Sequence, residues 1–167
     1  MKKIPTLFTR IYENHRVVGI KDEITPGCED AFKNGIATIK VDGSCYDPDP
    51  VTGHWPHWVE VTDNSSDHWF MAALNNSIKM GMDPDIESGT YEAIGPHFNG
   101  NPYNLSEDKL VKHGMELVYV KRDFKSISNW LNENPVEGLV FWLDGEPVCK
   151  IKRSDFGYEW PVKGVRR

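Results

Sequence analysis

The spacing of apolar residues predicts a helix near the middle of the chain. Within the stretch 67–80, four apolar residues have the helical spacing i, i+3, i+4 and i+8: Phe70, Ala73, Leu74 and Ile78. This spacing places them on one face of a helix. Ser65 and Ser66 precede the stretch and are good helix-capping residues, so we predict that the helix begins just after them.

Two shorter helices are predicted in the second half of the chain. The first spans Ser106–His113, with Ser106 as its cap and Gly114 at its end. The second spans Ser126–Asn134 and carries three apolar residues at helical spacing.

Strand-like runs fill most of the remaining chain. They are Gly35–Val41, Trp58–Thr62, Gly89–Gly95, Met115–Val120, Glu137–Leu143 and Glu146–Lys152. Because helices and strands do not alternate regularly, we predict an α+β domain with mostly antiparallel sheets. Two stretches rich in Pro, Gly and Asn, Asp47–Pro56 and Gly95–Asn104, are predicted to be long ordered loops.

Composition limits the fold and its partners. The chain has 167 residues, so we expect a single domain over 1–167. Its 19 basic and 25 acidic residues give a formal charge of −6, which argues against binding nucleic acid through a general cationic field. Three widely spaced cysteines form no CxxC pair, and no apolar stretch approaches the length of a membrane span or signal core. We expect a cytoplasmic monomer with no membrane partner.

Lys40 projects from the interior of a predicted strand. In the run Ala37–Gly43 the odd positions before the glycine are apolar, and the even positions, Thr38, Lys40 and Asp42, point to the opposite face. A lysine in such a place can support chemistry, or it can simply discourage aggregation at the edge of a sheet. The string KVDG alone does not decide between these alternatives.

The dipeptide Asp144-Gly145 joins two predicted strands and is a strong signal for a two-residue hairpin turn. This turn sets the register: residue 143 faces 146, 139 faces 150, and 137 faces 152. Glu137, Lys150 and Lys152 would then lie on one face near the open end of the hairpin. The alternative is an ion pair between Glu137 and Lys152 on a solvated face, contributing less than about 1 kcal/mol.

Glu92 occupies an unusual place for a carboxylate. In the run Gly89–Gly95 it shares a strand face with Thr90 and Ile94, so it needs a polar partner if that face is covered. A ribose hydroxyl would serve as this partner. The alternative is an ordinary exposed glutamate.

Four short motifs follow one another along the chain: KVDG at 40–43, YEAIG at 91–95, EGLVF at 137–141 and KIK at 150–152. In combination they resemble the covalent nucleotidyltransferase superfamily of ATP-dependent nucleic-acid ligases and mRNA capping enzymes. Three further segments are similar to those of small single-domain ATP-dependent RNA ligases: Ile4–Arg10, Thr52–Trp58 and Gly95–Tyr103. The resemblance spans nearly the whole chain. It implies a nucleotidyltransferase (adenylylation) domain, ATP-grasp-like, with mostly antiparallel sheets and flanking helices.

The resemblance also implies a role for each residue in these motifs. Lys40 would become linked to AMP, Glu92 would bind the ribose, and Glu137 would act on the metal. Lys150 and Lys152 would bind the α-phosphate and the departing pyrophosphate.

Three more residues would bind the nucleotide by the same resemblance: Arg10 at the triphosphate tail, the backbone of Ile39 at the adenine, and Asp42 within the KVDG motif. The implied cofactors are ATP and Mg²⁺, with Mn²⁺ as a substitute. Phosphate, water and one carboxylate supply the hard oxygen ligands that Mg²⁺ prefers. The implied partner is RNA with 5′-phosphate and 3′-hydroxyl ends.

The chemistry of an amine nucleophile agrees with these roles. An amine attacks phosphorus only when unprotonated, and the ordinary pKa of a lysine is about 10.4. Neighbouring cations disfavour the charged form, so Lys150, Lys152 and Mg²⁺ would lower the pKa of Lys40. The same cations would stabilise the charge that develops on the phosphoryl oxygens and on pyrophosphate.

Two other functions stay open at this point. A DNA ligase or a GTP-using capping enzyme shares the lysine motifs, but 15 residues follow Lys152, so we expect no appended OB-fold domain of the kind those enzymes need. A noncatalytic module that binds nucleotides or RNA ends would keep the fold without turnover. Every charged position that the chemistry requires is nevertheless present.

Other features are less specific. His54 and His57, flanked by tryptophans, could contact an RNA end, or their segment could simply pack against the domain. The loop Asp47–Trp58 is a candidate lid by its length and composition. Tyr119 could stack on adenine. Three other aromatic residues are expected in the core: Trp130, Phe141 and Trp142.

Overall fold

The structure is a computed structural model that describes residues 3–48, 61–62, 64, 67–83 and 89–162. The chain divides into two compact units, and each is described by itself. We call Lys3–Lys40 with Gly114–Val165 the terminal unit, and Val41–His113 the central unit. The single domain expected over 1–167 stays a prediction. No helix in the described ranges is long and apolar enough to cross a membrane.

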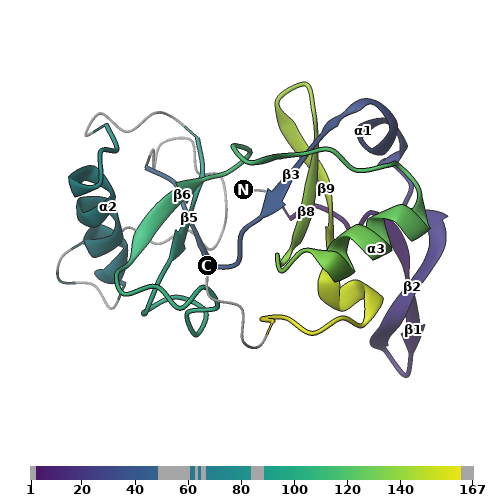
Figure 1. Cartoon of the computed structure of the whole chain (residues 1–167), viewed down its shortest axis with the longest axis horizontal. Coiled ribbons are helices and arrows are strands. Elements are labelled where there is room, and N and C mark those ends of the chain that lie inside the picture. The colour runs from purple at the N-terminus through teal and green to yellow at the C-terminus, as the bar shows by residue number, and fades with distance from the viewer. Residues whose placement is uncertain (1–2, 49–60, 63, 65–66, 84–88, 163–167) are drawn as a thin grey trace. The chain divides into compact units, whose positions relative to one another are not determined.

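The terminal unit contains a hairpin, a larger sheet and short helices (Figure 1). In chain order its elements are β1 (Phe8–Glu13), β2 (Arg16–Ile24), α1 (Glu29–Asn34), β3 (Ile36–Lys40), β7 (Leu117–Val118), α3 (Phe124–Glu133), β8 (Gly138–Leu143), β9 (Glu146–Lys152) and the 3₁₀ helix η1 (Arg153–Phe156). β1 pairs with β2, and the larger sheet has the strand order β7-β3-β8-β9. All of these named strand pairs are antiparallel.

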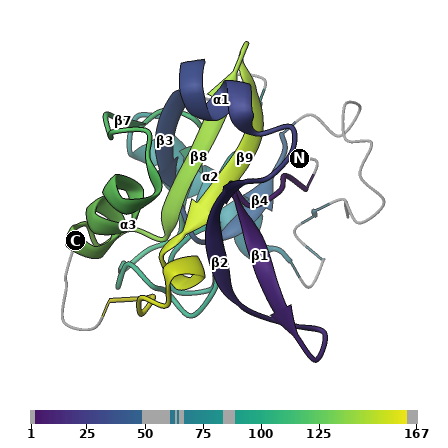
Figure 2. The same cartoon turned by 90° about the vertical axis from the view of Figure 1, so that its right-hand side faces the viewer.

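The core of the terminal unit packs against this larger sheet. Leu139 of β8 and Ile151 of β9 are fully buried and belong to the same apolar cluster as Ile127 and Leu131 of α3. The two views show α3 running beside β8 and β9 (Figures 1 and 2). Truncating one such leucine to alanine typically costs about 2–5 kcal/mol, so this packing fixes the strands that carry the lysines.

The central unit consists of a three-stranded sheet and one helix. Its elements are β4 (Ser44–Tyr46), α2 (Trp69–Lys79), β5 (Tyr91–Ile94) and β6 (Lys109–Lys112). The strand order is β4-β5-β6, and both pairs are antiparallel. Ala73 of α2 and Leu110 of β6 share one buried cluster, and the backbone N–H of Leu110 donates to the Ser77 hydroxyl at 2.8 Å.

The α+β class with mostly antiparallel sheets is therefore confirmed. The helix predicted over 67–80 is α2, and the one predicted over 126–134 is α3, which begins two residues earlier, at Phe124, with Asp123 as its cap. The described N-cap of α2 is His68, whereas Ser65 and Ser66 lie outside the described residues. Four predicted strands correspond to β3, β5, β8 and β9, and only two residues of the run 115–120 pair, as β7.

One helix prediction is wrong. The stretch Ser106–His113 contains the strand β6, in which Leu110 pairs with Ala93 of β5 and is 5% exposed. Cross-strand burial outweighs the capping signal of Ser106 because a short isolated helix is unstable without packing. Of the strand predicted over 58–62, residues 58–60 lie outside the described residues, and Val61 and Thr62 are not in a strand.

The β1–β2 hairpin, α1 and β4 were absent from the predicted elements. Asn14 and His15 both adopt positive φ, 47° and 63°, and form the tight turn between β1 and β2. This backbone conformation matches the twist of paired strands and tolerates asparagine well. The turn places Arg10 on a paired strand of the terminal unit.

Candidate functional site

The carboxylate of Glu137 contacts two lysines in the terminal unit. Lys40 Nζ lies 2.5 Å from Oε2, and Lys152 Nζ lies 2.6 Å from Oε1. The ion pair between Glu137 and Lys152 that was considered as an alternative is therefore present, but Glu137 is only 3% exposed, so its carboxylate does not lie on a solvated face. A buried carboxylate with a cation on each oxygen is a charge-assisted arrangement in which all three groups are held firmly.

Strand register brings these residues together. Lys40 of β3 is paired with Gly138 of β8, and Gly138 is in turn paired with Lys152 of β9. The two lysines are thus aligned across a residue that has no side chain. A Cβ atom on Gly138 would overlap the carbonyl oxygen of Ile151, so the close approach of β9 requires glycine here.

The hairpin register predicted for β8 and β9 is correct next to the turn and wrong further away. Leu143 pairs with Glu146 as expected, but Lys150 pairs with Val140 and Lys152 with Gly138. The cause is a β-bulge after Phe141, where β9 holds one residue more than β8. Glu137 still reaches Lys152, from the position that precedes β8.

Lys150 belongs to the same cationic group. Burial lowers the pKa of Lys150, and the charges of Lys40 and Lys152 lower it further. The backbone of Lys150 is fixed on the outer side of β9, since its carbonyl accepts from Leu7 N at 2.7 Å and its N–H donates to the Pro5 carbonyl at 3.0 Å. The predicted convergence of Glu137, Lys150 and Lys152 is therefore present, and Lys40 joins it.

Arg10 lies within electrostatic range of this group, because its charge also contributes to lowering the pKa of Lys150. Its guanidinium is 3.9 Å from Asp155 Oδ1. The other oxygen of Asp155 accepts from the backbone N–H of Lys152 at 2.8 Å. Asp155 therefore connects the Arg10 side chain to the end of β9.

Ile39 precedes Lys40 on β3, which pairs with β7 on one side and β8 on the other. The alternative of an edge-strand lysine is therefore wrong. The backbone N–H of Ile39 donates to the Glu116 carbonyl at 2.9 Å. Adenine recognition by the Ile39 backbone stays a prediction.

The aromatic residues fall into two groups. Phe141 is fully buried and Trp130 packs against the same core, as predicted, whereas Trp142 is half-buried and donates from Nε1 to the Thr38 hydroxyl at 2.8 Å. Tyr119 is 92% exposed and lines a pocket of about 470 Å³ beside β3 and β7. Stacking of Tyr119 on adenine stays a prediction.

Asp42 lies in the central unit, where it contacts the segment Gly95–Tyr103. Asn99 Nδ2 donates to Asp42 Oδ1 at 2.9 Å and to the Gly43 carbonyl at 2.7 Å. The backbone N–H of Asp42 donates to the Tyr103 hydroxyl at 2.6 Å. Hydrogen bonds thus join two segments that were identified separately in the sequence, the KVDG motif and residues 95–103.

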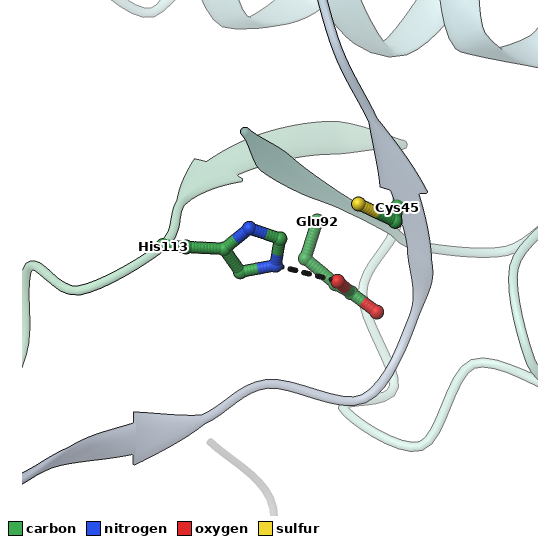
Figure 3. Close-up of side chains that lie close together, drawn as sticks. All are labelled: Cys45, Glu92 and His113. Atoms are coloured by element: carbon green, nitrogen blue, oxygen red, sulfur yellow. Dashed lines mark hydrogen bonds and ion pairs between the residues drawn. The ribbon is translucent and has the colours of Figure 1, made fainter. Parts of the chain in front are cut away.

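Glu92 is also in the central unit and is 8% exposed, so the alternative of an ordinary exposed glutamate is wrong. His113 Nε2 lies 2.7 Å from Glu92 Oε2 (Figure 3). The Thr90 hydroxyl lies 2.8 Å from His113 Nδ1. His113 was missed in the sequence because the wrong helix prediction for 106–113 concealed its register. His113 directly follows β6, and its backbone N–H donates to the Thr90 carbonyl at 3.1 Å.

The ligand atoms of Cys45, Glu92 and His113 all lie within 4.8 Å of one another. Cys45 pairs directly with Glu92 across β4 and β5, so the three side chains come from one rigid sheet (Figure 3). Thiolate, carboxylate and imidazole are donors that suit Zn²⁺. The three cysteines of the chain, all within the described residues, form no disulfide.

The predicted site residues thus form two groups. Lys40, Glu137, Lys150, Lys152 and Arg10 gather in the terminal unit, and Asp42 and Glu92 belong to the central unit. The first group can bind polyphosphate and present an amine to it. His54, His57 and most of the candidate lid fall in 49–60, outside the described residues.

Comparison with known proteins gives consistent matches. A family model described as RNA ligase 1 matches residues 75–166, a range that includes Glu92, His113, Glu137, Lys150 and Lys152. RNA ligase 1 from Danio rerio is 30% identical over 139 residues, and the corresponding proteins from Pongo abelii and Rattus norvegicus are 26% and 27% identical. Each match covers 66% of this chain and 43% of the relative, so the chain spans less than half the length of these relatives.

Proposed function

The chain belongs to the RNA ligase 1 family, and on this basis we propose that it is an ATP-dependent RNA ligase with a nucleotidyltransferase fold. It would join a 5′-phosphate end to a 3′-hydroxyl end through a lysyl-AMP intermediate. The observation that carries this proposal is the Glu137 carboxylate held between Lys40 and Lys152, with Lys150 close by. One cation is enough to pair with a carboxylate in a structural ion pair, whereas several cations are needed to bind the negative charges of a triphosphate.

The reaction proceeds in three steps. In the first, the Lys40 ammonium loses a proton to solvent, the resulting amine attacks the α-phosphorus of ATP, a nitrogen–phosphorus bond forms, and the bond to pyrophosphate breaks so that pyrophosphate leaves. In the second, an RNA 5′-phosphate oxygen attacks the same phosphorus and releases the lysine. In the third, an RNA 3′-hydroxyl attacks the 5′-phosphate of the adenylylated RNA and expels AMP.

Each of these residues of the terminal unit has its own role in the first step. Glu137 aligns Lys40 and accepts hydrogen from its ammonium group at 2.5 Å. Lys150 and Lys152 stabilise negative charge on the phosphoryl oxygens and on the leaving pyrophosphate. Arg10 would bind the outer phosphates. Glu92, in the central unit, would bind the ribose.

Mg²⁺ is the metal that this proposal implies. Each oxygen of Glu137 accepts one lysine and keeps a second lone pair, so the carboxylate fits a hard cation as one of its ligands. When bound, Mg²⁺ neutralises charge on the phosphates.

The formal charge of −6 is compatible with these roles of the basic residues. Four of the 19 basic side chains, those of Lys40, Lys150, Lys152 and Arg10, lie near one another, as binding of a polyphosphate and an RNA 5′-phosphate requires, while the chain as a whole is acidic. We therefore expect a short RNA footprint that depends on the phosphorylated end rather than on a long duplex.

Labelling with α-³²P-ATP and Mg²⁺ tests the proposal. The wild-type protein should retain label after denaturation, and Lys40→Arg should not. Lys33→Arg, a change at an exposed lysine of α1, is the matched control and should label normally. Unchanged labelling of Lys40→Arg would refute the assignment.

Substrate screens separate the neighbouring functions. Exclusive labelling by α-³²P-GTP would favour a capping enzyme, and sealing of DNA but not RNA would favour a DNA ligase. ATP binding without any covalent label would favour a noncatalytic module. The proposal requires ATP as the nucleotide and 5′-phosphorylated RNA as the strand that is sealed.

A further inference from the structure

His113 is held at both ring nitrogens by residues of β5 and the position before it. Its Nε2 lies 2.7 Å from Glu92 Oε2, and its Nδ1 lies 2.8 Å from the Thr90 hydroxyl. The ring is largely buried, with 13% of its side chain exposed. A histidine fixed at both nitrogens has neither rotational freedom nor a choice of partner.

The donors and acceptors in this chain of contacts follow from Glu92. A carboxylate can only accept, so Nε2 carries the hydrogen that is donated to Oε2. In the neutral ring Nδ1 is then an acceptor, and the Thr90 hydroxyl donates to it. This arrangement resembles the way in which carboxylate and hydroxyl partners orient functional histidines, but here the histidine orients the carboxylate.

We propose that His113 is a positioning residue that holds the Glu92 carboxylate in the orientation that binds a ribose hydroxyl of ATP. The inference rests on the proposed function for the role of Glu92. With Oε2 bound by His113, the other oxygen points away from the ring (Figure 3) and is the one that would accept the ribose hydroxyl. Thr90 completes the arrangement by fixing the ring.

The same geometry disfavours a metal ion as the occupant. Zn²⁺ ligands about 2.0 Å from the metal in a tetrahedral site are more than about 3 Å from one another. His113 Nε2 and Glu92 Oε2 are only 2.7 Å apart and face each other as donor and acceptor. Binding Zn²⁺ with Cys45 would require this hydrogen bond to break.

Nucleotide binding can be measured without adenylyl transfer in the Lys40→Arg background, which keeps a cation beside Glu137. The probes are ATP, 2′-deoxy-ATP and 3′-deoxy-ATP, titrated calorimetrically. We expect His113→Ala to weaken ATP binding at least about 10-fold, the lower end of the effect of losing one hydrogen bond to a charged group. The analogue that lacks the hydroxyl bound by Glu92 should bind equally well with and without His113.

Three variants establish that the effect passes through Glu92. His113→Gln keeps an N–H donor and should restore most of the lost affinity. Adding His113→Ala to Glu92→Ala should have no further effect, since coupled residues are not additive. His97→Ala removes a different histidine–carboxylate pair of the central unit, with Asp108, and should leave the ratio of ATP to deoxy-ATP affinity unchanged.

The outcomes distinguish this inference from the proposed function. If the wild-type protein forms lysyl-AMP but His113→Ala binds ATP normally, or weakens all three nucleotides equally, the inference is wrong and the function stands. If no lysyl-AMP forms but the selective effect of His113→Ala on ATP is present, the inference stands alone. Stoichiometric Zn²⁺ in the purified protein that Cys45→Ser removes would overturn the inference.

Discussion

Lys40 and Lys152 lie two strands apart, on β3 and β9, and are aligned across Gly138 of the strand between them. Their ammonium groups approach the two oxygens of one carboxylate, that of Glu137. A nucleophilic lysine and a phosphate-binding lysine are thereby fixed to the same rigid sheet. Each residue of this group can therefore be tested by its own substitution.

Removing the Glu137 carboxylate should affect both stability and chemistry. Glu137→Ala removes the carboxylate that contacts both Lys40 and Lys152, and because both lysines are partly exposed we expect a loss of about 1–3 kcal/mol in the free energy of unfolding. Thermal unfolding should detect it as a fall of about 2–4 °C in Tm per kcal/mol. Glu137→Gln keeps the size of the side chain and should lower the rate of lysyl-AMP formation by about 100-fold or more.

Glu133→Gln is the control for that pair of variants, because it changes an exposed glutamate of α3. It should alter neither Tm nor the labelling rate. Normal labelling of Glu137→Gln would mean that the carboxylate serves only to neutralise the two lysines.

Gly138→Ala tests the register itself. The new Cβ would meet the Ile151 carbonyl, so β9 must move away from β8 at the position of Lys152. We expect a loss of about 1–3 kcal/mol and a labelling rate more than about 10-fold lower. Gly19→Ala, on β2, has no atom within 4 Å of the added methyl group and should change stability by less than about 0.5 kcal/mol. Equal behaviour of the two variants would contradict the close approach at Gly138.

The hairpin shows how far sequence could predict this group. Asp144-Gly145 correctly placed the turn and the Leu143–Glu146 pair, and alternation placed Lys40 inside a strand. The bulge was not predictable. Val148 is the extra residue of β9, and an apolar residue in an apolar stretch carries no local sequence signal for a bulge. Glu137 contacts Lys152 despite this error, because it lies just before Gly138, the residue that pairs with Lys152.

Lys150 should make a pH-dependent contribution to stability. Burial and neighbouring lysines lower its pKa in the folded chain, so the folded state binds fewer protons than the unfolded state between that lowered pKa and about 10.4. The free energy of unfolding should therefore rise with pH across this window in the wild-type protein. Lys150→Met should remove that part of the rise and be at least as stable at pH 7, while labelling falls. Denaturant unfolding at several pH values measures the difference, and identical profiles would contradict it.

The three cysteines should differ in reactivity. Cys28 and Cys149 are fully buried, and burial raises the pKa of both thiols, so neither forms a reactive thiolate in the folded chain. Cys45 is only half-buried. Iodoacetamide at pH 8 should modify Cys45 first, and Cys28 and Cys149 only after unfolding, as read by peptide mass spectrometry. Early modification of Cys149 would show that the core around β9 opens readily.

His113 illustrates what sequence could not provide. Glu92 was placed correctly on a strand, with Thr90 just before it, but the partner of Glu92 depends on a strand pairing between residues far apart in the chain. Ser106 and Gly114 are good helix signals, and local signals cannot reveal that Leu110 pairs with Ala93 instead. Once β6 is known, its register with β5 places His113 beside Thr90.

The most direct measurement is the site and identity of the covalent adduct. Protein incubated with ATP and Mg²⁺ should gain the mass of one AMP, and peptide mapping should place it on Lys40. The Lys40→Arg variant should gain no mass under the same conditions, whereas Lys33→Arg should behave as the wild type does. An adduct on any other residue, or no adduct while ATP is bound, would contradict the account.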